Sequence, residues 1–374
     1  MALNKYRIGD LISVVDERNN LGIREFYGIN INKEFMPTAA TTEGLDETKY
    51  KVVRKNRFVY SGMQTGRDNC IRISMYTDDK PILVSPAYTT FEISALDTVI
   101  PLYFFMKFLS TEKDRYGAFC SDGSIRSNLD WEVFCDMKLE IPSLPIQQKY
   151  VDVYKAMLAN QKSYERGLED LKLTCDAYID TLKHSKKRVP IGNFITQIDN
   201  RNTSNAPYLF KGLSMDNYFI DSIADANELD FSNYKIVAPN EYGAVLMKVG
   251  RDARLTIARN DSTQNYLISP AYYTFQTSGI DSDYFMANVN RSEFERRGWF
   301  SCDTSARGSL AWSEFLQLTI PDADDKEQKI VSNLHKAFLT RTHINEKLKS
   351  HLKNICPILI KGSLEEARQE EAHG

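Results

Sequence analysis

The sequence contains a diverged internal repeat, and this feature limits the possible folds more than any other. The clearest matching segments are SPAYTTF at 85–91 and SPAYYTF at 269–275, GRD at 66–68 and 250–252, and Trp131 and Trp312. The matches occur in the same order in both halves of the chain. The offset between matching segments shortens slightly along the chain, as small length changes in loops would produce. We therefore predict a tandem duplication of one structural unit.

Each copy divides into a globular part and a helical part. Residues 1–145 and 188–323 contain short β-rich runs separated by Gly, Asn and Asp clusters, which is typical of mixed α/β globules. Residues 146–187 and 324–362 instead show a sustained helical periodicity. Residues 363–374 are rich in glutamate, and we expect a flexible tail there. The predicted fold class is α+β, with two tandem globules, each followed by a long helix.

Both helical segments carry apolar residues at alternating steps of three and four, the heptad pattern of a coiled coil. The pattern is interrupted by polar residues at Gln161, Arg341 and Asn345. Neither seam can be buried alone, and their equal lengths favour an antiparallel coiled coil with pseudo-twofold symmetry. Alternatively, each helix packs on the globules as an ordinary core helix. The predicted seam residues are Leu168, Leu171, Tyr178, Leu182, Leu348, Leu352, Ile355 and Leu359.

The motifs that resemble enzyme signatures are incomplete. SPAY at 85–88 resembles the polar-Pro-Pro-aromatic motif of DNA amino-methyltransferases, which act on a flipped base. Its second proline is alanine, however, and the sequence has no Phe-x-Gly-x-Gly loop for a methyl donor. PD at 321–322 and EQK at 327–329 resemble a nuclease signature, but they lie too close together for two adjacent strands. A phosphate-binding loop and a His-Glu-x-x-His zinc motif are also absent from the sequence, which therefore indicates no enzyme.

The Gly-Arg-Asp segments are candidates for contacts with DNA. Glycine lets backbones approach closely, and Arg and Gln side chains suit guanine and adenine edges. QT at 64–65 becomes KV at 248–249 while GRD is retained, as expected of two copies that read different sequences. Three alternatives are open. The Gly-Arg-Asp segment is a hairpin whose Arg pairs with the next Asp, Tyr88 and Tyr272 pack in the core, or Arg126 and Arg307 lie in plain surface loops. The candidate DNA-binding residues are Gln64, Gly66, Arg67, Tyr88 and Arg126, with Lys248, Gly250, Arg251, Arg254, Tyr272 and Arg307.

The composition excludes a strongly basic nucleic-acid coat. The chain has 47 Lys and Arg against 50 Asp and Glu, a formal charge of −3 and a pI near 6.1. The globular segments 1–145 and 188–323 carry net charges of −2 and −4. Such a chain would hold phosphates through a few placed arginines or through basic partner subunits.

The sequence also bears on the expected compartment. No run of about 18 apolar residues is present, so we expect no membrane-spanning segment. The six cysteines are scattered without a Cys-x-x-Cys pair, which suits free thiols in the cytoplasm and predicts no metal site.

These features together resemble the specificity subunit of Type I restriction-modification enzymes. The resemblance covers about residues 5–362 and rests on five elements, each present twice. They are an Ile-Gly start, a β-run with a glycine loop, the Ser-Pro-Ala-Tyr segment, a Ser…Arg…Trp segment, and Ile-Pro leading into a long helix. The second copy departs from the family pattern because it lacks the proline just before its helix.

The resemblance implies a non-catalytic, DNA-binding subunit. Each globule would be a target recognition domain that reads one half of a bipartite site in double-stranded DNA. The paired helices would act as a spacer and as a docking surface for two modification (methyltransferase) subunits and for restriction/translocase subunits. S-adenosylmethionine, ATP and Mg would bind to those partners, and no cofactor would bind to this chain. The alternatives are a stand-alone DNA methyltransferase or nuclease, and a coiled-coil scaffold that does not bind DNA.

Overall fold

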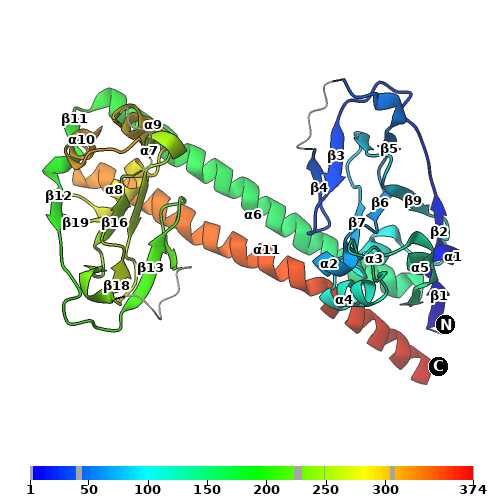
Figure 1. Cartoon of the computed structure of the whole chain (residues 1–374). Helices are drawn as coiled ribbons and strands as arrows, with labels where there is room; N and C mark the ends of the chain where they lie inside the picture. Colours follow the sequence, from blue (N-terminus) through cyan, green and yellow to red (C-terminus); the bar gives the residue numbers. More distant parts are fainter. Residues whose placement is uncertain (1–2, 39–43, 223–229, 248, 304–307, 374) are drawn as a thin grey trace. The chain divides into compact units, whose positions relative to one another are not determined.

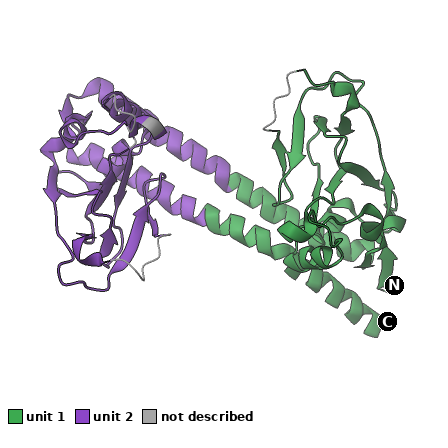
Figure 2. Cartoon of the chain, viewed as in Figure 1, with its two compact units in different colours: residues 1–163, 345–374 green, residues 164–344 purple. Residues whose placement is uncertain are grey.

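The chain forms two compact units, and each contains one globule and parts of both long helices (Figure 2). Unit 1 comprises residues 1–163 and 345–374, and unit 2 comprises residues 164–344. The computed structural model describes residues 3–38, 44–222, 230–247, 249–303 and 308–373.

The globule of unit 1 contains two four-stranded sheets and a two-stranded ribbon (Figure 1). The first sheet has the antiparallel order β2-β9-β6-β7. The second has the order β4-β3-β8-β5, in which β3 and β8 run parallel. Strands β1 and β10 form the ribbon. The strands are β1 Asn4–Arg7, β2 Ile12–Val14, β3 Phe26–Ile29, β4 Phe35–Pro37, β5 Lys51–Val53, β6 Phe58–Ser61, β7 Arg72–Met75, β8 Ile82–Val84, β9 Thr89–Ile93 and β10 Lys138–Ile141.

Short helices cover the first sheet of unit 1 and connect its strands. They are α1 Ile8–Leu11, α2 Thr65–Asp68, α3 Pro101–Met106, α4 Thr111–Phe119 and α5 Trp131–Asp136, with a 3-10 turn, η1, at Glu47–Lys49. The sequence predicted a loop where the structure has the short helix α2.

The globule of unit 2 repeats this topology, which confirms the duplication. Its sheets have the orders β12-β19-β16-β17 and β14-β13-β18-β15, and β11 pairs with β20. Strands β13 and β18 are the parallel pair, as β3 and β8 are in unit 1. The strands are β11 Arg188–Pro190, β12 Ile195–Ile198, β13 Leu209–Leu213, β14 Phe219–Asp221, β15 Lys235–Val237, β16 Tyr242–Val245, β17 Thr256–Arg259, β18 Tyr266–Ile268, β19 Tyr273–Thr277 and β20 Thr319–Pro321. The helices are α7 Val249–Asp252, α8 Ser282–Val289, α9 Ser292–Phe300 and α10 Trp312–Gln317, with 3-10 turns η2 Ile191–Asn193 and η4 Phe231–Asn233.

An aromatic cluster fills the core beneath the first sheet of each globule. Phe58 stacks on Phe91 with ring centroids 5.0 Å apart, and Tyr242 stacks on Phe275 at 4.9 Å. All four side chains are fully buried. Phe91 and Phe275, which end the matching segments 85–91 and 269–275, therefore belong to the core.

The two long helices are α6, Leu144–Ser185, and α11, Asp325–His373. One glutamine fixes the start of each helix to its own globule. Gln147 accepts a hydrogen bond from the Ile100 amide at 2.9 Å, and Gln328 accepts one from the Asp281 amide at 2.8 Å. These two glutamines occupy matching positions in the two copies, so the two junctions correspond in sequence and in structure.

Within each unit the helices run antiparallel. In unit 1, Lys149 pairs with Glu366 at 2.9 Å, and the Gln161 amide donates to Asn345 at 3.2 Å. In unit 2, Lys186, just after α6, pairs with Glu327 of α11 at 2.8 Å. Residue numbers thus rise along one helix as they fall along the other, and two of the polar seam positions meet each other.

The predicted seam residues are buried or partly buried on both helices. Leu182 is 3% exposed, and most of the other predicted seam residues are partly buried. The alternative of core helices is also correct in part, because Val151 and Cys356 are fully buried in the core of globule 1 and Ile179 in that of globule 2. In each unit the helix pair is therefore continuous with the core of its globule.

The expectation of a flexible tail at 363–374 is wrong. Helix α11 continues to His373, and Ser363 is fully buried with its hydroxyl 2.6 Å from that of Tyr103. Ala367 is 2% exposed, and Glu366 accepts hydrogen bonds from Lys149 and Tyr150. These distant partners in the globule and in α6 hold the glutamate-rich segment in a helix.

Candidate nucleic-acid interface

The Gly-Arg-Asp segment of each copy forms a single helical turn between two strands of the first sheet. In unit 1 this turn is α2, bounded by Gln64 and Asn69, whose φ angles of 60° and 48° lie in the left-handed region. In unit 2 the turn is α7. Left-handed residues on both sides of α2 change the chain direction where the turn begins and ends.

The loop that carries Arg126 packs directly against α2. The Gly66 amide donates to the Ser127 carbonyl at 3.0 Å, and the Gln64 amide donates to the Asn128 side chain at 3.2 Å. A Cβ at Gly66 would overlap the Ser127 hydroxyl, so this close approach requires glycine. The structure thereby brings together two motifs that lie far apart in the sequence.

Unit 2 has the same arrangement. The Gly250 amide donates to the Gly308 carbonyl at 2.7 Å, and a Cβ on Gly250 would lie 2.8 Å from the Gly308 Cα. Of the candidate residues in this copy, Lys248 and Arg307 lie outside the described residues, and Arg251 is described only as part of α7.

An aspartate fixes the conformation of the Arg126 loop. The Asp122 carboxylate accepts hydrogen bonds from the Ser124 hydroxyl at 2.7 Å and from the Asn128 amide at 2.9 Å. These bonds hold the pKa of Asp122 below its ordinary value, so the carboxylate is charged at neutral pH. In the second copy, Asp303 accepts from the Ser309 amide at 3.2 Å.

The guanidinium groups of Arg67 and Arg126 are exposed, and neither has a polar partner among the described residues. The alternative of an Arg–Asp hairpin pair is wrong for unit 1, because Asp68 pairs with Arg72 instead. Arg72 also donates to the Gln64 side-chain oxygen at 3.3 Å. Arg67 and Arg126 thus lie on two adjoining turns that are held together by backbone hydrogen bonds. Both guanidinium groups are available to donate to phosphates or to base edges.

The remaining candidates have other roles in the fold. Arg254 pairs with the buried Glu295 of α9 at 3.3 Å, so it helps to hold that helix. Tyr88 ends the turn between β8 and β9 and packs partly buried against the core of the second sheet. Tyr272 ends the same turn in unit 2 and is also partly buried. The structure thus places Tyr88 against the second sheet of its globule, and Tyr272 at the matching turn of unit 2.

Sequence reasoning missed two exposed phenylalanines. Phe119 ends α4 and Phe300 ends α9, and each is 86% exposed. They occupy matching positions in the two copies, directly before the arginine loop of each. Ile125, beside Arg126, is fully exposed as well. The signal was present in the sequence as a phenylalanine at matching positions in the two copies.

The described residues contain no group of three or more His, Cys, Asp and Glu side chains placed to hold a metal ion. In the same part of the chain, no helix combines the length and apolar character of a membrane span.

Comparisons with known proteins place this arrangement in a known fold. The chain is similar to the S subunit of a Type I restriction-modification system from M. genitalium, with a TM-score of 0.57 and 10% identity over 97% of this chain and 96% of that one. The chain has the fold of a Type I specificity subunit.

Two further solved structures match the chain at lower similarity. One is the HsdS subunit of Thermoanaerobacter tengcongensis, with a TM-score of 0.40 and 11% identity over 97% of this chain and 96% of that one. The other comes from work on the assembly and conformational transition of a Type I system, with a TM-score of 0.44 and 11% identity over 98% and 97%. No family model and no curated protein matches the sequence.

Proposed function

We propose that this chain is the sequence-specificity subunit of a Type I restriction-modification complex in the cytoplasm. Each globule reads one half of a bipartite site in double-stranded DNA, and the helix pair sets the spacing between the halves. The observation that carries the proposal is the duplicated pairing of the Gly-Arg-Asp turn with an arginine loop, on a chain that has the S-subunit fold. A fold by itself does not define a function, so the argument depends on these turns.

In unit 1, Arg67 and Arg126 would make the polar contacts. Close packing of Gly66 against Ser127 fixes their separation, so that a helical turn and a loop enter the DNA groove as one body. Phe119, which is exposed beside them, would stack on a base or wedge into a base step. These contacts would discriminate between bases while contributing little to overall charge neutralisation.

Partners would supply the rest of the binding energy and the chemistry. The net negative charge of the chain predicts weak counterion release by this subunit alone. Two modification subunits that bind S-adenosylmethionine, and restriction/translocase subunits that use ATP and Mg, would dock on the helices. This chain would carry no catalytic site for any of those cofactors and would transfer no methyl group by itself.

Methylation of a randomised DNA library by the chain assembled with its modification subunits tests the proposal. Arg67→Ala should weaken selection at one half-site by about 1–3 kcal/mol, that is, roughly 5- to 150-fold at one position. Arg251→Ala should have the same effect at the other half-site. The matched control is Arg24→Ala, which removes an exposed arginine of the same globule.

Unchanged selectivity in both arginine variants would exclude these turns as the DNA-reading elements. Selective methylation of the library by the purified chain without partners would show that the chain is an enzyme and would overturn the subunit assignment. Arg→Ala at a phosphate contact, in contrast to a base contact, would weaken binding to all sequences alike. It would also reduce the slope of log K against log salt concentration by about one unit.

A further inference from the structure

The C-terminal half of each long helix meets a globule, and the two meeting points correspond residue by residue. In unit 2, α6 meets α9, and in unit 1, α11 meets α4. The pair Cys175 and Ile179 in α6 corresponds to Cys356 and Ile360 in α11, and both pairs pack into the core of a globule. The two junctions therefore share a register, and their side chains can be compared directly.

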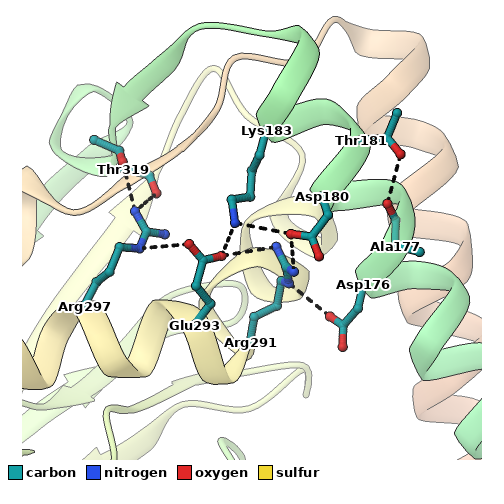
Figure 3. Close-up of polar contacts among 9 residues, drawn as sticks. All are labelled: Asp176, Ala177, Asp180, Thr181, Lys183, Arg291, Glu293, Arg297 and Thr319. Atoms are coloured by element: carbon teal, nitrogen blue, oxygen red, sulfur yellow. Dashed lines mark hydrogen bonds and ion pairs between the residues drawn. The ribbon is translucent and has the colours of Figure 1, made fainter.

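The junction of unit 2 is filled by its own ion pairs (Figure 3). Arg291 is 11% exposed and donates to Asp176 at 3.0 Å and to Asp180 at 2.7 Å, both on α6. Lys183 contacts Asp180 at 3.2 Å and also pairs with Glu293. Burial raises the pKa of Asp180, but its bonds to Arg291 and Lys183 lower the pKa by more, so the carboxylate stays charged. The cations of this junction are thus matched by carboxylates.

The junction of unit 1 lacks the corresponding helix carboxylates. Ser110 stands in place of Arg291, Pro357 in place of Asp176, Lys361 in place of Asp180, and Leu364 in place of Lys183. The structure has a cavity of about 480 Å³ at this place, lined in part by these four residues. The cationic side chains that line it are Lys5, Lys107, Lys113, Lys138, Lys361 and Arg368.

Only part of this charge is neutralised. Glu140 pairs with Lys5 at 3.4 Å and with Arg368 at 3.0 Å, and Glu365 pairs with Lys361 at 3.7 Å. The third carboxylate of the lining is the exposed Glu112. Among the described residues, no carboxylate forms an ion pair with Lys107, Lys113 or Lys138, so the cavity keeps an excess of positive charge.

Lys107 is the most informative of these residues because it is only 5% exposed. Its ammonium lies 5.4 Å from the centroid of the Tyr103 ring, which offers a weak attraction for a cation. Burial lowers the pKa of Lys107 to about 7. Glu140 attracts the Lys107 ammonium without forming an ion pair with it, and burial outweighs this attraction. A buried amine without an ion-pair partner is costly to keep charged, and an anion in the cavity would reduce that cost.

We propose that this cavity of unit 1 binds a small phosphate-bearing anion, whose oxygens take the part that Asp176 and Asp180 play at the junction of unit 2. The volume lies within the range of small-molecule sites. The apolar side chains of Met106 and Leu139 also line the cavity and would suit the base of a nucleotide, whereas the lysines would suit its phosphates. This inference goes beyond the proposed function and needs neither DNA nor partner subunits.

Titration calorimetry on the full-length chain, without DNA, tests the proposal with two probes at near-physiological salt. Tripolyphosphate and Mg-free ATP should each bind at one site per chain, since the junction of unit 2 is already filled. Equal affinities would identify the phosphates as the whole ligand, and tighter binding of ATP would show that the apolar wall receives the base.

Two variants and a control decide the location. Lys107→Met removes the buried ammonium at similar volume and should weaken binding at least tenfold. Lys155→Met, which removes an exposed lysine on α6 of the same unit, should leave binding unchanged. Ser110→Arg combined with Lys361→Asp gives unit 1 the ion pair of unit 2, and should abolish binding without lowering the melting temperature. Absence of one-site binding, or equal loss with Lys107→Met and Lys155→Met, would overturn the proposal.

Discussion

The close approach of Gly66 to Ser127 can be tested by a pair of substitutions whose effects should not add. In Gly66→Ala the new Cβ would overlap the Ser127 hydroxyl and would lie 2.9 Å from the Ser127 Cβ, well inside the ordinary carbon–carbon contact of about 3.5–4.0 Å. Such overpacking costs about 1–3 kcal/mol. Because α2 is helical at this position, alanine without the clash would gain about 0.5–1 kcal/mol instead.

Ser127→Gly should therefore reverse the sign of the Gly66→Ala effect. Ser127 has a φ of 50°, which glycine adopts freely, and its counterpart in unit 2 is the glycine Gly308. On that background the next neighbour of the new Cβ is the Ser121 Cβ at 3.2 Å. We expect Gly66→Ala to be neutral or slightly stabilising there, which corresponds to a coupling of about 1 kcal/mol or more.

Native-state hydrogen exchange of the amides in β6 and β7 measures this coupling locally, as the free energy of opening. Gly250→Ala in unit 2 is the matched comparison. Its Cβ would meet the backbone of Gly308 at 2.8 Å, and no side chain is present there to remove. An equal cost of Gly66→Ala with and without Ser127→Gly would refute the reasoning, because steric overlap with that side chain would then not be what requires glycine.

Three further outcomes follow from buried polar groups and from one exposed ring. Gln161→Leu leaves Asn345 without its partner in the seam and should cost about 1–3 kcal/mol in thermal unfolding, whereas the double leucine variant should recover most of that loss. Asp283 is held by Arg259 at 2.9 Å and Lys336 at 3.0 Å, and His335 Nδ1 lies 3.7 Å from its carboxylate. Burial raises the pKa of Asp283, but these three neighbours lower it by more. Its stabilisation is thus complete above the unfolded pKa near 4 and is lost as pH falls below it, so Asp283→Asn should cost about 3 kcal/mol at pH 7 and flatten the acid limb of a pH–stability profile. Phe119→Ala should leave the melting temperature within about 1 °C, because the ring is 86% exposed, but should weaken DNA binding by the assembled complex in a filter or fluorescence assay.

Patterns carried by neighbouring residues were sufficient to predict much of the fold. The duplication and the heptad steps predicted two similar globules and two long helices. The polar interruptions at Gln161 and Asn345 fell on facing positions of the pair, where the structure shows a hydrogen bond between them. A seam is periodic along one segment, and a repeat is visible as matched segments, so neither requires knowledge of distant contacts.

Features that depend on partners far away in the sequence could not be predicted in the same way. The four residues of α2 have no helical pattern of their own, and the turn exists because Gly66 meets the loop at Ser127. The helix beyond residue 362 is held by Tyr103 and Lys149, which no local rule connects to a glutamate-rich tail. Arg254 was predicted as a DNA contact from its place beside the Gly-Arg-Asp segment, and its ion pair with the distant Glu295 had no signal in the sequence.

The difference between the two helix–globule junctions predicts opposite responses to salt in one molecule. In unit 2, Arg291 holds two carboxylates of α6, so screening should loosen α9. In unit 1, the cations around Lys107 outnumber the carboxylates, so screening of their repulsion should tighten α4. Raising NaCl from about 50 to about 500 mM shortens the Debye length from about 14 to about 4 Å, and should change the opening free energies by a few tenths of a kcal/mol in opposite directions.

Hydrogen exchange of the α4 and α9 amides at the two salt concentrations compares both junctions in the same sample. The variant that combines Ser110→Arg with Lys361→Asp provides the control, because it gives unit 1 the charge pattern of unit 2. In that variant α4 should respond to salt in the same direction as α9 does. Loosening of both helices by salt in the unmodified chain would mean that repulsion among the cavity lysines is already relieved by their carboxylates. The excess of positive charge at the junction of unit 1 would then have no energetic consequence.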